Sequence, residues 1–133
     1  MNKDDLKKRL KQLGVRTAKL CSRLPLTIIN RVYIGQLVRC SSSSASNYRA
    51  ACRGKSKADF INKLKIVEEE LDESMFFYEM IAEFNSDFKA ELRELYKEAD
   101  ELLSIIVASI NTANRNLATT NPKSKVKNLK SNA

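Results

Sequence analysis

The sequence contains no histidine and no tryptophan, and its 133 residues include only three glycines and two prolines. A sandwich or barrel of many short strands needs far more turn residues, so this composition favours an all-α fold. Without histidine, the chain lacks the commonest general base and the ligand that defines Glu-x-x-His di-iron bundles. Triads built on histidine and that class of metal bundle are therefore excluded.

Cysteine is also scarce. Cys21, Cys40 and Cys52 are odd in number and form no C-x-x-C pair, so they do not make up a zinc site. We expect reduced thiols that fill small spaces in the core. The run Glu68-Glu-Glu70 does not predict a metal site either, because consecutive side chains diverge around a helix. We expect no metal, no cofactor and no enzymatic activity.

Long apolar runs are missing as well. The most apolar window, Leu102 to Ile110, is about half the length needed to span a bilayer. The N-terminal MNKDDLKKRL has no apolar segment of the kind found in secretory signals. We expect a cytoplasmic protein without membrane contact, and the length suits one domain.

Charge is abundant and unevenly distributed around a net charge of +8. Residues 1–65 contain 16 basic and 3 acidic side chains, whereas residues 66–118 contain 4 basic and 13 acidic ones. The two halves would attract each other when packed, within one chain or between subunits. A basic face that binds nucleic acid is the other interpretation.

Apolar residues recur every three or four positions in four segments, which predicts four amphipathic helices. Their expected ranges are 4–23, 27–53, 57–84 and 87–118. Pro25 ends the first, Thr27 is a candidate N-cap of the second, and Ser56-Lys-Ala-Asp59 matches a capping box before the third. We predict an all-α, antiparallel up-down four-helix bundle over residues 1–118 and a disordered basic tail over 119–133.

The run Ser41-Ser-Ser-Ser-Ala-Ser46 has the composition of a flexible linker. On a helical wheel, however, an uninterrupted helix over 27–53 keeps its arginines on one side and its apolar and small residues on the other. Ser41 and Ser44 fall on the packing side. We therefore predict that the run is helical and lets another helix approach closely, with Phe76-Phe-Tyr78 as one interdigitating partner.

The arginine side of this helix is a candidate nucleic-acid-binding surface. Its residues are Arg31, Arg39, Arg49 and Arg53, extended by Lys55 and Lys57. No aromatic residue is interleaved, so binding would be directed at phosphates and sensitive to salt. In the alternative, the arginines pair with acidic residues of a neighbouring helix, and the protein is a structural or adaptor oligomer without nucleic-acid contact. The acidic candidates are Glu68, Glu69, Asp72 and Glu73.

Several stretches together resemble a known family. They are Arg23-Leu-Pro25, Gly35-Gln-Leu-Val-Arg39, Ser46-Asn-Tyr-Arg-Ala-Ala-Cys-Arg53, Ser56-Lys-Ala-Asp-Phe-Ile-Asn-Lys-Leu-Lys65, Ile66-Val-Glu-Glu-Glu-Leu-Asp-Glu-Ser74 and Glu98-Ala-Asp-Glu-Leu102. Over about residues 6–117 they are similar to the bacterial four-helix-bundle proteins of the 23S ribosomal RNA intervening-sequence family. The chain departs from the family pattern at Ser41–Ser44, Ala50 and Phe76–Tyr78, which we interpret as repacking.

The resemblance implies four long antiparallel helices that assemble into a homopentamer. Some members of the family are encoded within insertions in large-subunit ribosomal RNA genes. Similar proteins are accessory factors of diversity-generating retroelements, in which a basic surface binds nucleic acid and the reverse transcriptase. The implied partners are therefore further copies of the chain, RNA or DNA, and a reverse transcriptase. Gln36, Arg39, Asn47 and Arg49 match family positions, and we expect Gln36 and Asn47 to form hydrogen bonds within or between subunits.

Overall fold

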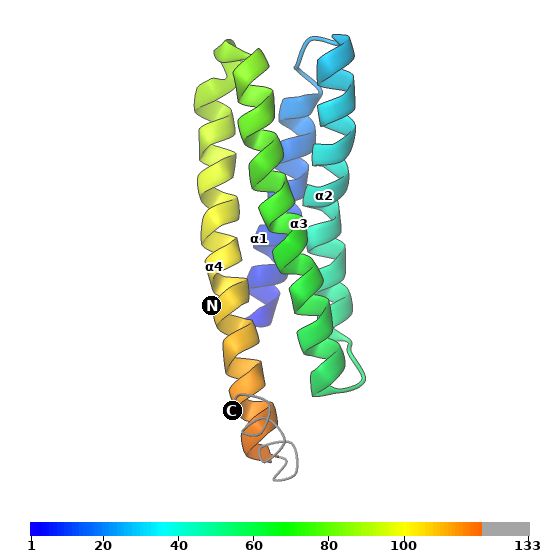
Figure 1. Cartoon of the computed structure of the whole chain (residues 1–133), viewed down its shortest axis with the longest axis vertical. Coiled ribbons are helices and arrows are strands. Elements are labelled where there is room, and N and C mark those ends of the chain that lie inside the picture. Colours follow the sequence, from blue (N-terminus) through cyan, green and yellow to red (C-terminus); the bar gives the residue numbers. More distant parts are fainter. Residues whose placement is uncertain (121–133) are drawn as a thin grey trace, which may run out of the picture.

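Four long helices run up and down beside one another (Figure 1). The structure is a computed structural model, and it describes residues 1–120. The helices are α1 (Lys3–Cys21), α2 (Ile28–Cys52), α3 (Lys57–Phe84) and α4 (Lys89–Thr120), with a short 3-10 helix, η1 (Ser86–Phe88), before α4. The predicted all-α bundle is confirmed, and no helix boundary differs from its predicted position by more than two residues. Of the predicted tail, residues 119 and 120 belong to α4 and the rest lies outside the described residues.

Side-chain caps mark the starts of the first three helices. The Asp5 N–H donates to Asn2 Oδ1 at 2.8 Å within a capping box before α1. Thr27 and Ser56 each accept a hydrogen bond from the backbone N–H three residues later. Such bonds satisfy donors that the first helical turn leaves free. Local chemistry therefore sets these starts, and Thr27 is the N-cap that the sequence predicts.

Helices that follow one another in the chain also lie side by side. α2 packs most extensively on α3 and then on α1, whereas α4 packs on α3 and along a smaller contact on α1. The α1–α2 and α3–α4 connections meet at one end, drawn at the top of Figure 1, and the α2–α3 connection lies at the other. We call these the upper and lower ends. The start of α1 points to the lower end, where Lys3 Nζ lies 4.8 Å from the centre of the Phe60 ring on α3.

The core is a single cluster of hydrophobic side chains from all four helices. Its most deeply buried members include Leu10, Leu13, Leu37, Leu64, Leu71, Ile81, Leu92, Leu102 and Ile106. Every buried side-chain N or O atom that the structure describes has a hydrogen-bond partner. Within residues 1–120, no helix combines the length and the apolar character that crossing a bilayer requires.

Two polar pairs sit inside this core. The hydroxyls of Thr17 on α1 and Tyr78 on α3 lie 2.7 Å apart. At the upper end, the side-chain amides of Asn30 and Asn85 each donate to the other at 2.8 Å. Each also donates to a backbone carbonyl, Asn30 to Pro25 and Asn85 to Ile81. The asparagine pair therefore fastens the α1–α2 connection to the end of α3.

The serine run lies in the middle of α2, as predicted, and Ser41 and Ser44 are fully buried. Ser44 Oγ donates to the Ser41 carbonyl at 2.7 Å, which satisfies its hydroxyl within the helix. The close neighbour is α1 of the same chain, because a Cβ on Gly14 would lie 3.6 Å from Ser42 Cα. The expected insertion of Phe76 is wrong, since this side chain is 52% exposed.

Candidate nucleic-acid interface

Charge divides the bundle lengthwise into two layers. α1 carries seven basic and two acidic residues, and α2 carries three basic residues and no acidic one. α3 carries three basic and eight acidic residues, and α4 carries four and five. The packed pair α1 and α2 forms a basic layer, and the packed pair α3 and α4 forms an acidic layer. The two layers meet where α2 packs on α3 and α1 packs on α4.

Arginines bridge the two layers where they meet. Arg9 on α1 binds Glu98 at 2.6 Å and Glu101 at 3.2 Å, both on α4. These carboxylates raise the pKa of Arg9 further above its usual range, chiefly through the Glu98 hydrogen bond. Arg23, just after α1, binds Glu91 at the start of α4. These arginines have their charges matched inside the chain.

Arg39, one of the six predicted nucleic-acid-binding residues, is held in the same way. Its guanidinium lies 2.7 Å from Glu73 and 3.4 Å from Glu70, both on α3, and it donates to Gln36 Oε1 at 3.4 Å. Burial raises the pKa of Glu70, and the positive charge of Arg39 opposes that rise. The pairing alternative therefore describes Arg39, with Glu70 and Glu73 as the acidic partners.

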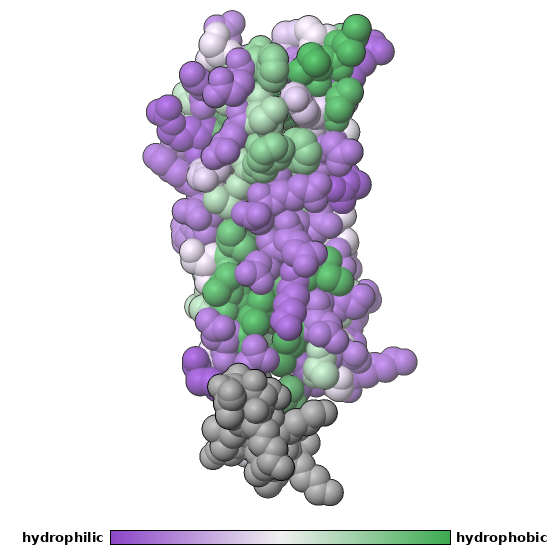
Figure 2. Space-filling model, in the orientation of Figure 1, coloured by the Kyte–Doolittle hydropathy of each residue, from purple (hydrophilic) through white to green (hydrophobic). Residues whose placement is uncertain are grey.

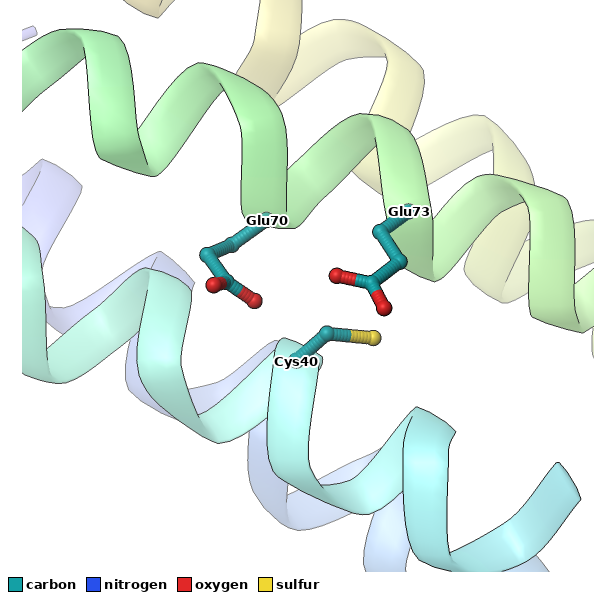
Figure 3. Close-up of side chains that lie close together, drawn as sticks. All are labelled: Cys40, Glu70 and Glu73. Carbon is teal, nitrogen blue, oxygen red and sulfur yellow. The ribbon is translucent and has the colours of Figure 1, made fainter. Parts of the chain in front are cut away.

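Cys40 of α2 faces Glu70 and Glu73 of α3 (Figure 3). The cysteine sulfur and one oxygen of each carboxylate lie within 4.8 Å of one another, a spacing that metal ligands could have. Protein contacts already account for these groups, because Arg39 binds both carboxylates and Ser74 Oγ donates to Cys40 Sγ at 3.2 Å. Burial raises the pKa of the Cys40 thiol, which favours the protonated form. We assign no metal to this cluster.

The other predicted basic residues do not gather into one compact stripe. Arg31 lies in the first turn of α2, about 27 Å along the helix from Arg49 at a rise of 1.5 Å per residue. Arg31, Arg49 and Arg53 are exposed, and none of them forms an ion pair within the part of the chain that the structure describes. Lys55 and Lys57 lie at the α2–α3 connection, so only Arg31 is near the upper end.

Three lysines of α1 join Arg49 on this basic layer. Lys7, Lys8 and Lys11 line a groove between α1 and α2 with a volume of about 630 Å³, and Arg49 lines its other side. The prediction from the sequence considered α2 and the residues that follow it up to Lys57, and it missed these lysines of α1. A usable signal existed, because the basic residues of α1 lie outside its leucine stripe.

Gln36 and Asn47 form hydrogen bonds within α2. Gln36 accepts from Arg39, and Asn47 Nδ2 donates to the Ser43 carbonyl one turn earlier at 2.9 Å. Contacts of these residues between subunits stay a prediction.

The upper end exposes large apolar side chains. We define the apolar patch as Leu26, Ile28, Ile29, Val32 and Phe84, which are 72%, 82%, 42%, 58% and 57% exposed. Figure 2 shows apolar atoms gathered at the upper right, over the start of α2. Ile29 is the least exposed member of the patch and lies close to the start of α2. Apolar surface of this kind is typical of a protein contact site.

The chain is similar to known proteins both in sequence and in fold. The family model of the 23S rRNA-intervening sequence protein matches residues 3–108. A crystal structure of a protein of unknown function from the S23 ribosomal protein family of Bacteroides thetaiotaomicron is similar, with a TM-score of 0.74 and 24% identity. That match covers 84% of this chain and 99% of the other, and it supports the fold. No curated protein matches.

Proposed function

The chain belongs to the 23S rRNA-intervening sequence protein family, and we propose that it is a non-enzymatic, oligomeric bundle that binds RNA or DNA through its basic layer. The observation that carries this proposal is the excess of unpaired cations on α1 and α2. Arg49, Arg53, Lys8 and Lys11 are exposed and make no ion pair among the described residues. Cations of this kind release bound counterions when they meet phosphates, which drives binding.

Self-association belongs to the same proposal. The apolar patch at the upper end would be covered by further copies of the chain, and the family resemblance implies five copies. Most of the unpaired cations lie toward the lower end, so assembly would leave them exposed. Repeating a weak cationic surface on each subunit would strengthen binding to a long polyanion. The free state of all three cysteines suits a cytoplasmic location.

An adaptor without nucleic-acid contact is the second candidate, and the ion pairs of Arg39 favour it. If those pairs typify the layer, the remaining cations would meet acidic surfaces of other subunits or of a protein partner. A reverse transcriptase is the protein partner that the resemblance suggests. The two candidate functions predict different results when the charges of Arg49 and Arg53 are reversed. Nucleic-acid binding is lost under the first, and the oligomer dissociates under the second.

The discriminating experiment is light-scattering size-exclusion chromatography with and without a labelled structured RNA, at 50 mM and 200 mM salt. We expect the variant Arg49→Glu/Arg53→Glu to keep the oligomer mass and to lose RNA binding. The matched control is Lys89→Glu/Arg93→Glu, which makes the same charge change on exposed positions of α4. Dissociation of the oligomer by the Arg49 and Arg53 variant, with no RNA bound to the unmodified protein, would favour the adaptor.

A further inference from the structure

The groove between α1 and α2 stays open because its floor consists of small residues. At the helix crossing, a Cβ on Gly14 would lie 3.6 Å from Ser42 Cα and 3.7 Å from the Ser41 carbonyl oxygen. Ala18 on α1, and Ala45 and Ser46 on α2, continue the floor along the groove. Leucines at these positions would fill the space, so the volume of about 630 Å³ is a direct result of side-chain size.

Over its lower half the groove has three lysines on its α1 rim and Arg49 on its α2 rim. The helices are antiparallel and Gly14 lies opposite Ser42, so Lys7 and Lys11 lie near the level of Arg49. Lys8, Lys11 and Arg49 form no ion pair within residues 1–120, whereas Lys7 lies 3.8 Å from Asp4. Asp4 is the one acidic residue among the described residues that line the groove, and it stands at the end near the start of α1.

From this geometry, and resting on the function proposed above, we infer that the groove binds the phosphodiester backbone of a single-stranded nucleic acid. The axes of packed helices lie about 8–10 Å apart, which limits the width of the groove between them. A nucleic-acid duplex is wider than this, because its major groove alone measures about 12 Å across. One backbone fits there with its phosphates between the two cationic rims. No aromatic residue lines the groove within the described chain, so the bases point outward and are not read.

The number of cations sets the expected salt dependence. For single strands, the slope of log K against log salt is about −0.7 per neutralised phosphate. Three to four cations therefore give a slope of about −2 to −3 per groove, or a loss of about 20- to 50-fold between 50 mM and 200 mM salt. Removing two of them should lower the slope by about 1.4 and weaken binding by about 25-fold at 0.1 M salt.

The test measures fluorescence anisotropy of a labelled 20-nucleotide strand, as RNA and as DNA, and of the corresponding duplex. Lys8→Gln/Lys11→Gln removes two rim cations, and Ser46→Leu fills the floor without changing charge. The matched control is Lys63→Gln/Lys65→Gln, because these exposed lysines of α3 lie toward the same end but outside the groove. Light scattering of every variant reports the oligomer mass.

We expect both groove variants to weaken single-strand binding, the control to leave it within a few-fold, and RNA and DNA strands to bind alike. Equal weakening by the control and the groove variants would overturn the groove while leaving nucleic-acid binding in place. A duplex that binds as tightly as the single strand would overturn the single-strand assignment. Groove variants that lower the oligomer mass would show that another copy's acidic surface occupies the groove. If the unmodified protein binds none of the probes, the proposed nucleic-acid-binding function itself is wrong.

Discussion

The hydroxyl pair of Thr17 and Tyr78 joins α1 to α3, two helices that are not neighbours around the bundle. Their oxygens lie 2.7 Å apart, and the residues are 0% and 1% exposed. The variants Thr17→Val and Tyr78→Phe each remove one hydroxyl with little change of shape, and the double variant removes both. The three variants together form a double-mutant cycle across the core.

We expect the two single variants to differ in cost. In Tyr78→Phe, the Thr17 hydroxyl can turn to a carbonyl one turn back in α1, so the free energy of unfolding should fall by only about 0.5–1.5 kcal/mol. In Thr17→Val, the buried phenol of Tyr78 loses its hydrogen-bond partner and has no such local alternative, which should cost about 1–3 kcal/mol. The double variant should lie close to the unmodified protein, because neither polar atom is left buried without a partner.

Urea unfolding followed by circular dichroism gives the four free energies of unfolding. Tyr96→Phe is the control, because Tyr96 is only half-buried and its hydroxyl interacts with Glu79, a surface residue of α3. We expect a change below about 0.5 kcal/mol there. A double variant whose loss equals the sum of the two single losses would refute the reasoning. It would mean that the two hydroxyls contribute independently and do not bond to each other in solution.

Four further predictions concern stability. Gly35→Ala should raise the free energy of unfolding by about 0.5–1 kcal/mol, since the added carbon meets no atom within 4 Å beyond the adjoining backbone of α2. Gly14→Leu should lower the free energy of unfolding by forcing α1 away from α2. Thermal melts test both. Arg39→Gln should destabilise the protein more at pH 7 than at pH 4. Burial raises the pKa of Glu70, so this carboxyl is more often neutral at pH 4 and then needs no counter-charge. Equal shifts of the urea midpoint at the two pH values would contradict this. Burial raises the pKa of Cys21 from 9.0 to about 11, so its stability contribution should be complete below pH 9 and lost as pH rises toward 11; Cys21→Ala should flatten that decline in a pH series of melts.

The helices and the placement of the serine run were predictable because their signals are local. A cap and the residue three positions later interact before any tertiary contact forms, which sets the starts at Thr27 and Ser56. The serine run was assigned correctly because a helix must keep its phase. Arg31 and Arg49 stay on the exposed side only if the residues between them are helical, and a linker has no reason to keep that relation.

The candidate site was less predictable because it depends on which helices become neighbours and at what register. Arg39 and Arg49 lie on the same side of α2 in a helical wheel, yet Arg39 reaches Glu73 of α3 and Arg49 lines the groove with α1. Cys40 likewise lies 30 or more positions before Glu70 and Glu73 in the sequence. No rule on residue spacing predicts that these side chains come together. Phe76 was proposed, with Phe77 and Tyr78, as a bulky partner for the small residues of α2, but Phe76 is exposed and Tyr78 is the buried member of the three.

Arginines and lysines differ in their ion pairs, and this difference explains why the basic layer keeps unpaired cations beside an acidic layer. The ion pairs between different parts of the bundle are all made by arginines, namely Arg9, Arg23 and Arg39, as far as the described residues show. A guanidinium can bind a carboxylate through two parallel hydrogen bonds, which suits a fixed position between helices. Two lysines pair with an acidic residue three positions earlier, Lys7 with Asp4 and Lys97 with Glu94. Such exposed pairs contribute little. Five glutamates of the acidic layer are therefore bound by arginines, whereas Lys8 and Lys11 of α1 make no ion pair within residues 1–120.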